Sequence, residues 1–358
     1  MKKIWAFLLI LCLLLSGCSY WMNGSYSSVK PHKEPAYQTE KPAVQVENFE
    51  ELMAALESLL ENGAESGVLS LQYTEDETAR TDMDRAISEI RRTNPFAVYG
   101  VEMLEYSIGS SGGQNAASIQ ISYLPSRVRA DKIQRLQTPA DAERIIAQCL
   151  DNCDAGVVLY LENPEQADYD QMVADYALAY PQKVIETPEV AVSLYPEQGQ
   201  KQIVEIKFSY QTSRAQLRTL QNRVAPVFTS ASQYVIGNWT AMQKAERLYT
   251  FLMNRYEYNI QTSITPAYSL LLHGVGDSRA FAVVYGAMCR EAGLDGYVVT
   301  GTRDGAPWVW NTVQIDGEYY YIDLLRCNEG NGFRLCTRAE MTNYVWDYSA
   351  YPIAEEIS

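Results

Sequence analysis

The stretch Gly276-Asp277-Ser278-Arg279-Ala280-Phe281-Ala282 decides how the C-terminal part of this chain folds. Asp277 and Ser278 are both side chains that cap a helix, because their oxygens accept hydrogen bonds from free backbone N–H groups. The apolar residues after them, continuing through Tyr285 to Leu294, predict a long buried helix. Cys289 lies three turns along this helix, so we expect its thiol to be buried.

Short segments on both sides of this helix predict the strands that accompany it. Upstream, Met242 to Tyr256 has the spacing of an amphipathic helix and leads into the strand Tyr256-Glu257-Tyr258. Downstream, the predicted strands are Gly296–Gly301, Pro307–Asn311 and Tyr319–Asp323. Asp316-Gly317, between the last two strands, predicts a tight hairpin turn.

In their order and spacing, these segments resemble the transglutaminase-like superfamily, a papain-type fold, over about residues 240–352. The family places a catalytic Cys at the start of the long helix, a His on a later strand and an Asp at the end of the next strand. The resemblance assigns these three positions to Ser278, Trp308 and Asp323. Only the Asp is retained.

The two replacements remove the groups that the family's chemistry requires. A thiolate at a helix N-terminus is the nucleophile, and a His acts first as base and then as acid. A Ser hydroxyl is a weak nucleophile without a base, and an indole cannot accept a proton. We therefore expect no intact catalytic triad. The alternative is an active peptidase or acyltransferase that uses Ser278 with an unrecognised base, such as His273, a Lys, or one of Tyr319–Tyr321.

The same positions have simpler structural interpretations. Ser278 can cap the helix together with Asp277, and Asp323 can bond to backbone or to Trp308. Trp308 can fill the space that a His would occupy, or it can form an aromatic wall for a sugar or peptide. We expect a ligand cleft lined by aromatic side chains, and its candidate residues are Trp308, Trp310, Tyr319 and Tyr321, although Trp310 is most simply explained by packing.

The N-terminus has the features of a bacterial lipoprotein signal. Lys2 and Lys3 precede the apolar run Ile4–Leu15, which is shorter than the roughly 20 residues of a membrane span. Leu15-Ser16-Gly17-Cys18 is a lipobox, so residues 1–17 are the expected signal peptide and Cys18 the lipidated residue. Residues 18–45 then form a flexible tether. The expected location is outside the cytoplasm, anchored to the cell membrane by lipid on Cys18.

Between the tether and the C-terminal part, the pattern helix, strand, helix, strand, strand occurs twice. Ile121-Ser-Tyr-Leu-Pro-Ser-Arg127 resembles Phe208-Ser-Tyr-Gln-Thr-Ser-Arg214, 87 residues later. We predict two tandem α+β modules at residues 46–135 and 136–225, followed by a transglutaminase-like domain at 226–358. The fold class is therefore α+β. One larger α+β domain with accidental internal similarity is the alternative.

Charge and composition restrict the partners and cofactors. The formal net charge is −15 and becomes −17 once Lys2 and Lys3 leave with the signal peptide, which argues against nucleic acid. Only two histidines occur, so neither a His-based metal centre nor another cofactor is expected. Five cysteines remain after Cys12 and Cys18 are set aside: Cys149, Cys153, Cys289, Cys327 and Cys336. The last two flank a Gly-rich turn and could bridge a hairpin.

These patterns favour a membrane-anchored lipoprotein whose inactive domain binds or scaffolds a cell-wall peptide, a glycan or another envelope protein. The serine-dependent enzyme described above is one alternative. A purely structural lipoprotein without a ligand is another.

Overall fold

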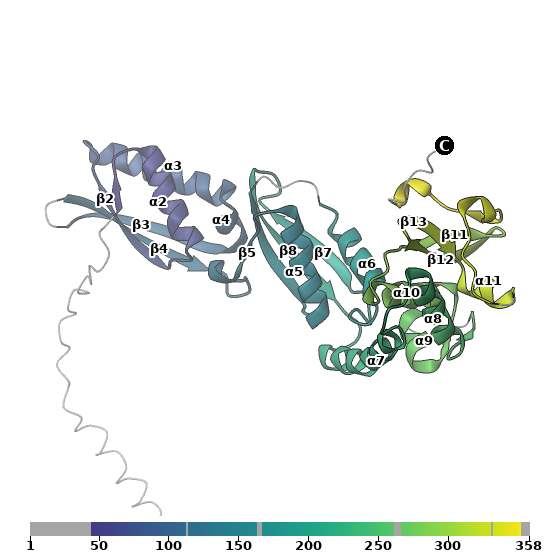
Figure 1. Ribbon diagram of the computed structural model, residues 1–358. Coiled ribbons are helices and arrows are strands. Elements are labelled where there is room, and N and C mark those ends of the chain that lie inside the picture. Colours follow the sequence, from purple (N-terminus) through teal and green to yellow (C-terminus); the bar gives the residue numbers. More distant parts are fainter. Residues whose placement is uncertain (1–43, 112–113, 163–166, 261–265, 331, 352–358) are drawn as a thin grey trace, which may run out of the picture. The chain divides into compact units, whose positions relative to one another are not determined.

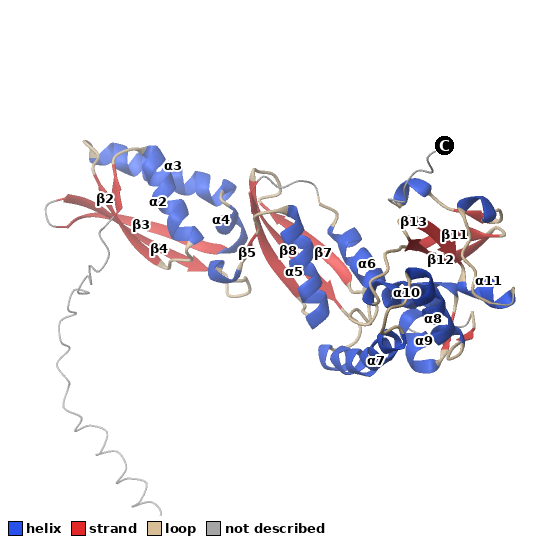
Figure 2. Cartoon of the chain, viewed as in Figure 1, coloured by secondary structure: helices blue, strands red, loops and turns tan. Residues whose placement is uncertain are grey.

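The computed structural model describes residues 44–111, 114–162, 167–260, 266–330 and 332–351. Helices and strands are interspersed throughout these ranges, which confirms the predicted α+β class (Figures 1 and 2). The signal peptide, Cys18 and nearly all of the tether, which the sequence predicts, lie outside the described residues.

The first region is a four-stranded sheet with the order β1-β2-β4-β3. Its elements are β1 (Val44–Val46), α2 (Phe49–Glu61), β2 (Ser66–Leu71), α3 (Asp76–Thr93), α4 (Pro95–Gly100), β3 (Val101–Ser111) and β4 (Gln114–Tyr123). Asn48 caps α2 by accepting a hydrogen bond from the Glu51 backbone N–H at 3.0 Å. Helices α2 and α3 cover one face of the sheet (Figure 1), and Leu56, Met83 and Ile119 are buried between them and the strands.

The second region has the same arrangement, because its sheet follows the order β5-β6-β8-β7. A 3₁₀ turn at Ala130–Lys132 leads into it, and its elements are β5 (Gln134–Arg135), α5 (Pro139–Asn152), β6 (Gly156–Glu162), α6 (Tyr169–Ala179), β7 (Glu189–Tyr195) and β8 (Lys201–Ser209). The two similar sequence segments that begin at Ile121 and Phe208 lie at the ends of β4 and β8, which are equivalent strands in the two sheets.

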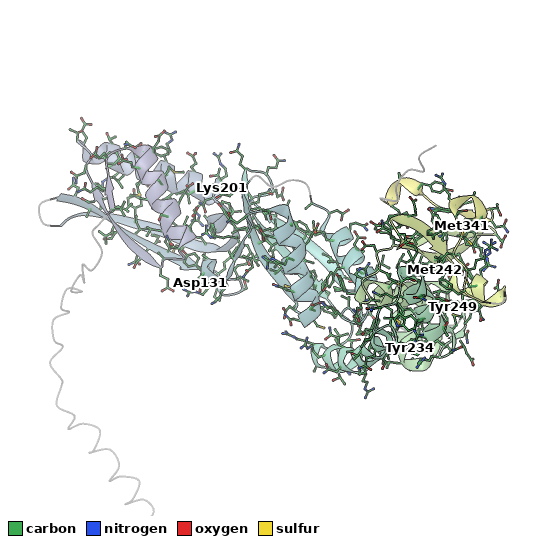
Figure 3. The ribbon with its side chains drawn as sticks, in the orientation of Figure 1. Asp131, Lys201, Tyr234, Met242, Tyr249 and Met341 are labelled. Atoms are coloured by element: carbon green, nitrogen blue, oxygen red, sulfur yellow. The ribbon has the colours of Figure 1, made fainter. Side chains whose placement is uncertain are left out.

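The third region combines a cluster of helices with a second kind of sheet. Its elements are α7 (Arg214–Tyr234), α8 (Ala241–Met253), β9 (Glu257–Tyr258), α9 (Pro266–His273), β10 (Val275–Gly276), α10 (Ser278–Glu291), β11 (Val298–Arg303), β12 (Ala306–Ile315), β13 (Glu318–Ile322), α11 (Leu324–Glu329) and β14 (Tyr344–Val345). The main sheet has the order β13-β12-β11-β14, and β9 pairs with β10 in parallel. In Figure 3, the labelled Tyr249 and Met341 belong to this region, and both are buried.

The predicted central helix is α10, which begins at Ser278 and contacts α8, α9 and β12. The Cys289 thiol is buried, as expected, and burial raises its pKa to about 12. Asp316 and Gly317 both have positive φ angles, 51° and 93°, which is the backbone of the predicted tight hairpin turn.

One predicted boundary falls inside a helix. Helix α7 runs without a break across residues 225 and 226, and it contains Pro226. Its buried side chains Leu217, Val224 and Phe228 pack into the core of the third region. The expected end of the second module at residue 225 is therefore wrong, because α7 packs on the third region on both sides of that residue.

The first and second regions share part of one core. Val158, Tyr160 and Ile203 of the second sheet pack with the buried residues of the first region. The Arg127 guanidinium lies 4.9 Å from the Tyr99 ring centroid and 5.0 Å from that of Tyr195, and the two rings contact each other edge-on at 5.2 Å. Arg127 Nη1 is also 2.6 Å from Glu205 Oε2. Stacking, hydrogen bonding and apolar burial therefore combine at this junction.

All five cysteines in the described ranges are free thiols. Cys327 and Cys336 do not form the hairpin bridge that the sequence allowed, and the Cys327 thiol instead donates to the Arg334 carbonyl oxygen. No helix within the described part of the chain combines the length and the apolarity needed to cross a membrane.

Candidate functional site

The start of α10 carries the residue at the expected nucleophile position. Asp277 is the N-cap, and its carboxylate accepts a hydrogen bond from the Ala280 N–H at 2.9 Å. Ser278 is the first residue of the helix and not its cap. Its Oγ accepts a hydrogen bond from the Val309 N–H at 3.4 Å, and only 9% of the residue is exposed. Ser278 thus joins the start of α10 to strand β12.

Trp308 precedes Val309 on β12, and its indole points to Asp323. The Trp308 Nε1–H donates to Asp323 Oδ2 at 2.8 Å. Ser278, Trp308 and Asp323 therefore lie in one place, linked through the Val309 backbone and the indole. The structure brings together the three residues that the sequence placed at the triad positions.

Asp323 accepts hydrogen bonds at both carboxylate oxygens. It caps α11, where Oδ1 accepts from the backbone N–H groups of Leu325 and Arg326 at 3.1 and 3.2 Å. Oδ2 accepts from Trp308, from the Tyr344 hydroxyl at 2.7 Å and from Arg303 at 3.4 Å. Burial and the bond to Asp323 both raise the pKa of Tyr344 well above its ordinary value, which keeps its hydroxyl a donor. The sequence-based expectation that Asp323 bonds to backbone and to Trp308 is confirmed.

Trp308 is partly exposed, and its ring contacts a tyrosine and an arginine whose side chain is 19% exposed. Tyr258 of β9 is 46% exposed, and its ring centroid is 6.0 Å from that of Trp308. The Arg303 guanidinium carbon lies 5.3 Å from the Trp308 ring centroid. Its Nη2 donates a hydrogen bond to Glu329 Oε2 at 2.7 Å. We refer to Tyr258, Trp308 and Arg303 as the Trp308 surface.

The other candidates for the ligand cleft lie elsewhere. Trp310 and Tyr321 are 1% and 3% exposed, and they pack with Trp346 in the small core under β11 and β14. Tyr319 is half-buried against Tyr297 and pairs with Gln314, six residues along β12 from Trp308. That separation is roughly 20 Å along a strand. These three residues lie on the same face of the sheet as Trp308, but they do not line an open cleft with it, because Trp310 and Tyr321 are buried and Tyr319 lies far along the strand.

Sequence reasoning missed Tyr258 and Arg303 as members of the surface. Tyr258 belongs to the Tyr-Glu-Tyr segment, which was assigned only as a strand. Arg303 ends β11, and no sequence signal links it to Trp308, because the contact depends on the β11–β12 register, in which Arg303 pairs with Ala306.

The alternative bases are not bonded to Ser278. His273 ends α9, is exposed, and makes an edge contact with the Tyr268 ring at 5.7 Å. Among the described residues, no imidazole, amine or carboxylate forms a hydrogen bond with Ser278 Oγ. Within the same ranges, no group of three or more His, Cys, Asp or Glu side chains is arranged to hold a metal ion.

Comparison with family models identifies the type of domain in the C-terminal part of the chain. Residues 230–324 match the family model described as Transglutaminase-like superfamily. The C-terminal part of the chain is thus a transglutaminase-like domain, as the sequence indicated. No curated protein matches the chain.

Three solved structures are similar to the chain at low identity. They are a TGase (10% identity, TM-score 0.28, 57% of this chain covered), a candidate protease from Parabacteroides distasonis (10%, 0.24, 72%) and a candidate cysteine protease from Cytophaga hutchinsonii (16%, 0.25, 42%). The matches cover 62%, 40% and 66% of those chains, so this chain spans less than two thirds of each.

Proposed function

We propose that the transglutaminase-like domain of this chain is catalytically inactive and that it binds or scaffolds a ligand of the cell envelope. The observation that carries the proposal is the 2.8 Å hydrogen bond from Trp308 Nε1 to Asp323 Oδ2. An indole N–H only donates, so it can hold the carboxylate but cannot take a proton from a nucleophile. The His that an Asp would orient for catalysis is replaced by Trp308, whose indole has no acid–base function.

Ser278 supports the same conclusion from the other side of the site. Its hydroxyl oxygen accepts the Val309 N–H, and Trp308 stands where the family has its base. Without a base, a serine hydroxyl remains a weak nucleophile even at a helix N-terminus. Ser278 has a structural role instead, because its hydrogen bond with the Val309 N–H connects α10 to β12.

The Trp308 surface supports a binding role. It combines an exposed tyrosine, the face of a tryptophan and an arginine, which are the side chains enriched where proteins bind partners. Aromatic faces of this kind stack on sugar rings and pack on peptides. The ligand classes that fit are therefore a cell-wall glycan, a cell-wall peptide or a segment of another envelope protein.

The location completes the proposal. The lipobox at Leu15–Cys18 would place the chain outside the cytoplasm, held to the membrane by acyl chains on Cys18. Two modules with the same sheet order would then stand between the tether and the transglutaminase-like domain. Substituting Cys18 by Ala should release the chain from the membrane fraction, and persistent membrane association would argue against this anchor.

The inactivity is tested by rebuilding the missing groups with Ser278→Cys and Trp308→His in one chain. A His at position 308 would start from a strand position whose present side chain already reaches Asp323. We expect thiol alkylation at position 278 to become fast well below the ordinary thiol pKa in the double variant and to stay slow in Ser278→Cys alone. Cys289 is the internal control, because its raised pKa keeps it protonated.

The wild-type chain should neither hydrolyse nor crosslink glutamine and lysine peptides. A measurable rate that disappears in Ser278→Ala would overturn the proposal and establish the serine-dependent alternative.

Binding is tested by titrating the full chain with peptidoglycan fragments, with calorimetric detection. Trp308→Ala should abolish the heat of binding, whereas Trp239→Ala, at another partly exposed tryptophan, should not.

A further inference from the structure

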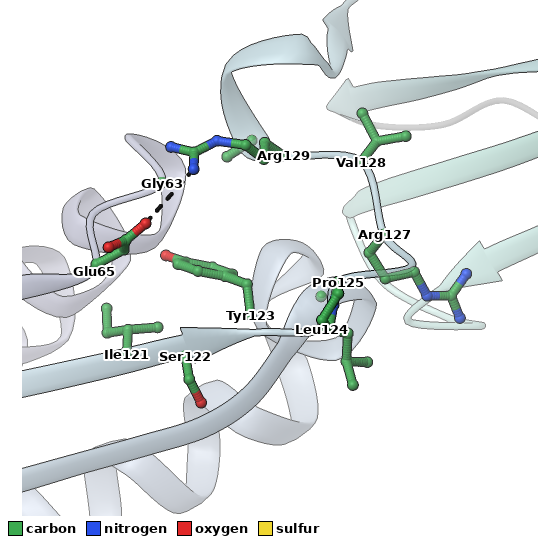
Figure 4. Close-up of a pocket in the computed structure, with 12 residues that line it drawn as sticks. Gly63, Glu65, Ile121, Ser122, Tyr123, Leu124, Pro125, Arg127, Val128 and Arg129 are labelled. Atoms are coloured by element: carbon green, nitrogen blue, oxygen red, sulfur yellow. Dashed lines mark ion pairs between the residues drawn. The ribbon is translucent and has the colours of Figure 1, made fainter. Parts of the chain in front are cut away.

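A cavity of about 420 Å³ opens at the end of the first sheet, far along the sequence from the Trp308 surface (Figure 4). This volume lies within the range of about 300–1,000 Å³ that small-ligand sites occupy. Residues at the end of β4 and in the connection to the second region line it, and the turn between α2 and β2 faces them. The cavity plays no part in the function proposed above.

The lining of the cavity combines apolar and polar side chains, and hydrogen bonds hold parts of it in place. Ile121 is buried, Tyr123 is half-buried, and Leu124 and Val128 are 36% and 40% exposed although they are large hydrophobic side chains. The Tyr123 hydroxyl donates to the Ala64 carbonyl oxygen at 2.9 Å, and the Val128 N–H donates to the Tyr99 hydroxyl at 3.2 Å. A ligand would therefore meet a preformed surface and would not have to order it.

Two opposite charges lie together at the cavity, and Arg129 Nε also donates to Asp131 Oδ1 at 3.4 Å outside the cavity lining. Glu65 Oε1 lies 3.6 Å from an Arg129 guanidinium nitrogen (Figure 4), and their side chains are 74% and 68% exposed. An ion pair this long and this exposed contributes little to stability, so both charges can exchange partners at small cost. A ligand with a single charge would be repelled by one member of the pair. A ligand with an ammonium and a carboxylate would satisfy both.

We propose that this cavity binds a short zwitterionic peptide with an apolar side chain. Its carboxylate pairs with Arg129, its ammonium group pairs with Glu65, and the side chain packs on the Tyr123 ring, which lies beside both charges. A carboxylate can bond to two guanidinium nitrogens at once, which makes Arg129 the stronger of the two contacts.

The probe for this site is the dipeptide leucyl-leucine, titrated into the full chain by calorimetry. We expect saturable binding, and a loss of affinity of about 10-fold when the peptide is N-acetylated or C-amidated. Arg129→Ala should weaken binding of the free dipeptide by about the same factor. Glu65→Gln should weaken the free dipeptide but not the N-acetylated one, which has no ammonium group to lose.

Arg144→Ala is the matched control, because Arg144 is an exposed arginine that pairs with Asp141 and does not line the cavity. It should bind as the wild type does. Absence of saturable binding at millimolar dipeptide, or equal affinities for wild type and Arg129→Ala, would refute the proposal.

Discussion

The hydrogen bond between Trp308 and Asp323 can be removed by Trp308→Phe. The phenyl ring keeps an aromatic side chain at this position but has no N–H group. A hydrogen bond to a charged acceptor contributes about 1.5–3 kcal/mol. Asp323 retains four other donors, so no unpaired charge is left behind. We therefore expect the free energy of local unfolding around Asp323 to fall by about 1.5–3 kcal/mol.

Trp239→Phe is the matched control for this substitution. Its indole also donates one hydrogen bond, to the Ile236 carbonyl oxygen at 3.1 Å, but this residue is 37% exposed and its acceptor is neutral. A neutral, solvated bond contributes about 0.5–1.5 kcal/mol. Trp239→Phe therefore tests whether replacing a tryptophan away from Asp323 alters exchange at residues 323–330.

The suitable assay is amide hydrogen exchange measured on peptides that cover residues 323–330, because a chain with several cores need not unfold in one step. Exchange should accelerate about 10- to 150-fold in Trp308→Phe, which corresponds to the expected free energy. It should not change in Trp239→Phe. Equal exchange in both variants would refute the reasoning that Trp308 holds Asp323 and the start of α11.

Two further predictions concern the rest of the chain. Arg127→Ala removes the 2.6 Å ion pair with Glu205, whose side chain is only 10% exposed. In urea titrations it should lower the free energy of unfolding by about 2–4 kcal/mol. Arg129→Ala is the control at an exposed ion pair and should change the free energy of unfolding by less than about 0.5 kcal/mol. Burial raises the pKa of Cys149 to about 11, so alkylation of this thiol should increase about tenfold per pH unit from pH 7 to 9. Because an unfolded thiol ionises near pH 8.5, the folded chain should also lose stability as the pH rises from about 8.5 towards 11, and a flat stability profile there would contradict the assignment.

Local patterns in the sequence predicted much of the fold. The start of α10 follows from Asp277 and the apolar run after it, and the hairpin before β13 follows from Asp316-Gly317. Helix α7 was missed although Ser213 and Gln216 form a capping box, which is a readable signal. Pro226 inside the pattern argues for a break, and the packing of α7 on the third region outweighs the cost of that proline.

Only those residues of the candidate site that belong to sequence motifs could be predicted. Ser278, Trp308 and Asp323 came from motif order, and the structure brings them together. The composition of the surface around them depends on strand register, which a single sequence does not specify. Trp310 lies two residues from Trp308 on the same face of β12, yet it is buried in a core with the Trp346 and Tyr344 rings, whereas Trp308 packs against that core and stays partly exposed.

The retention of Asp323 in a site without its His has a structural explanation that can be tested. Three strands each send one donor to Oδ2, namely Arg303 from β11, Trp308 from β12 and Tyr344 from β14, while Oδ1 caps α11. In Asp323→Asn, the amide NH₂ must face either these three donors or the two backbone N–H groups, and it can satisfy neither. A buried charge pair that loses one partner costs about 3–5 kcal/mol, so we expect a loss of that size in the urea unfolding of the third region. A leftover catalytic Asp with no structural role would instead tolerate Asn at almost no cost, and that result would show that decay and not stability explains its presence.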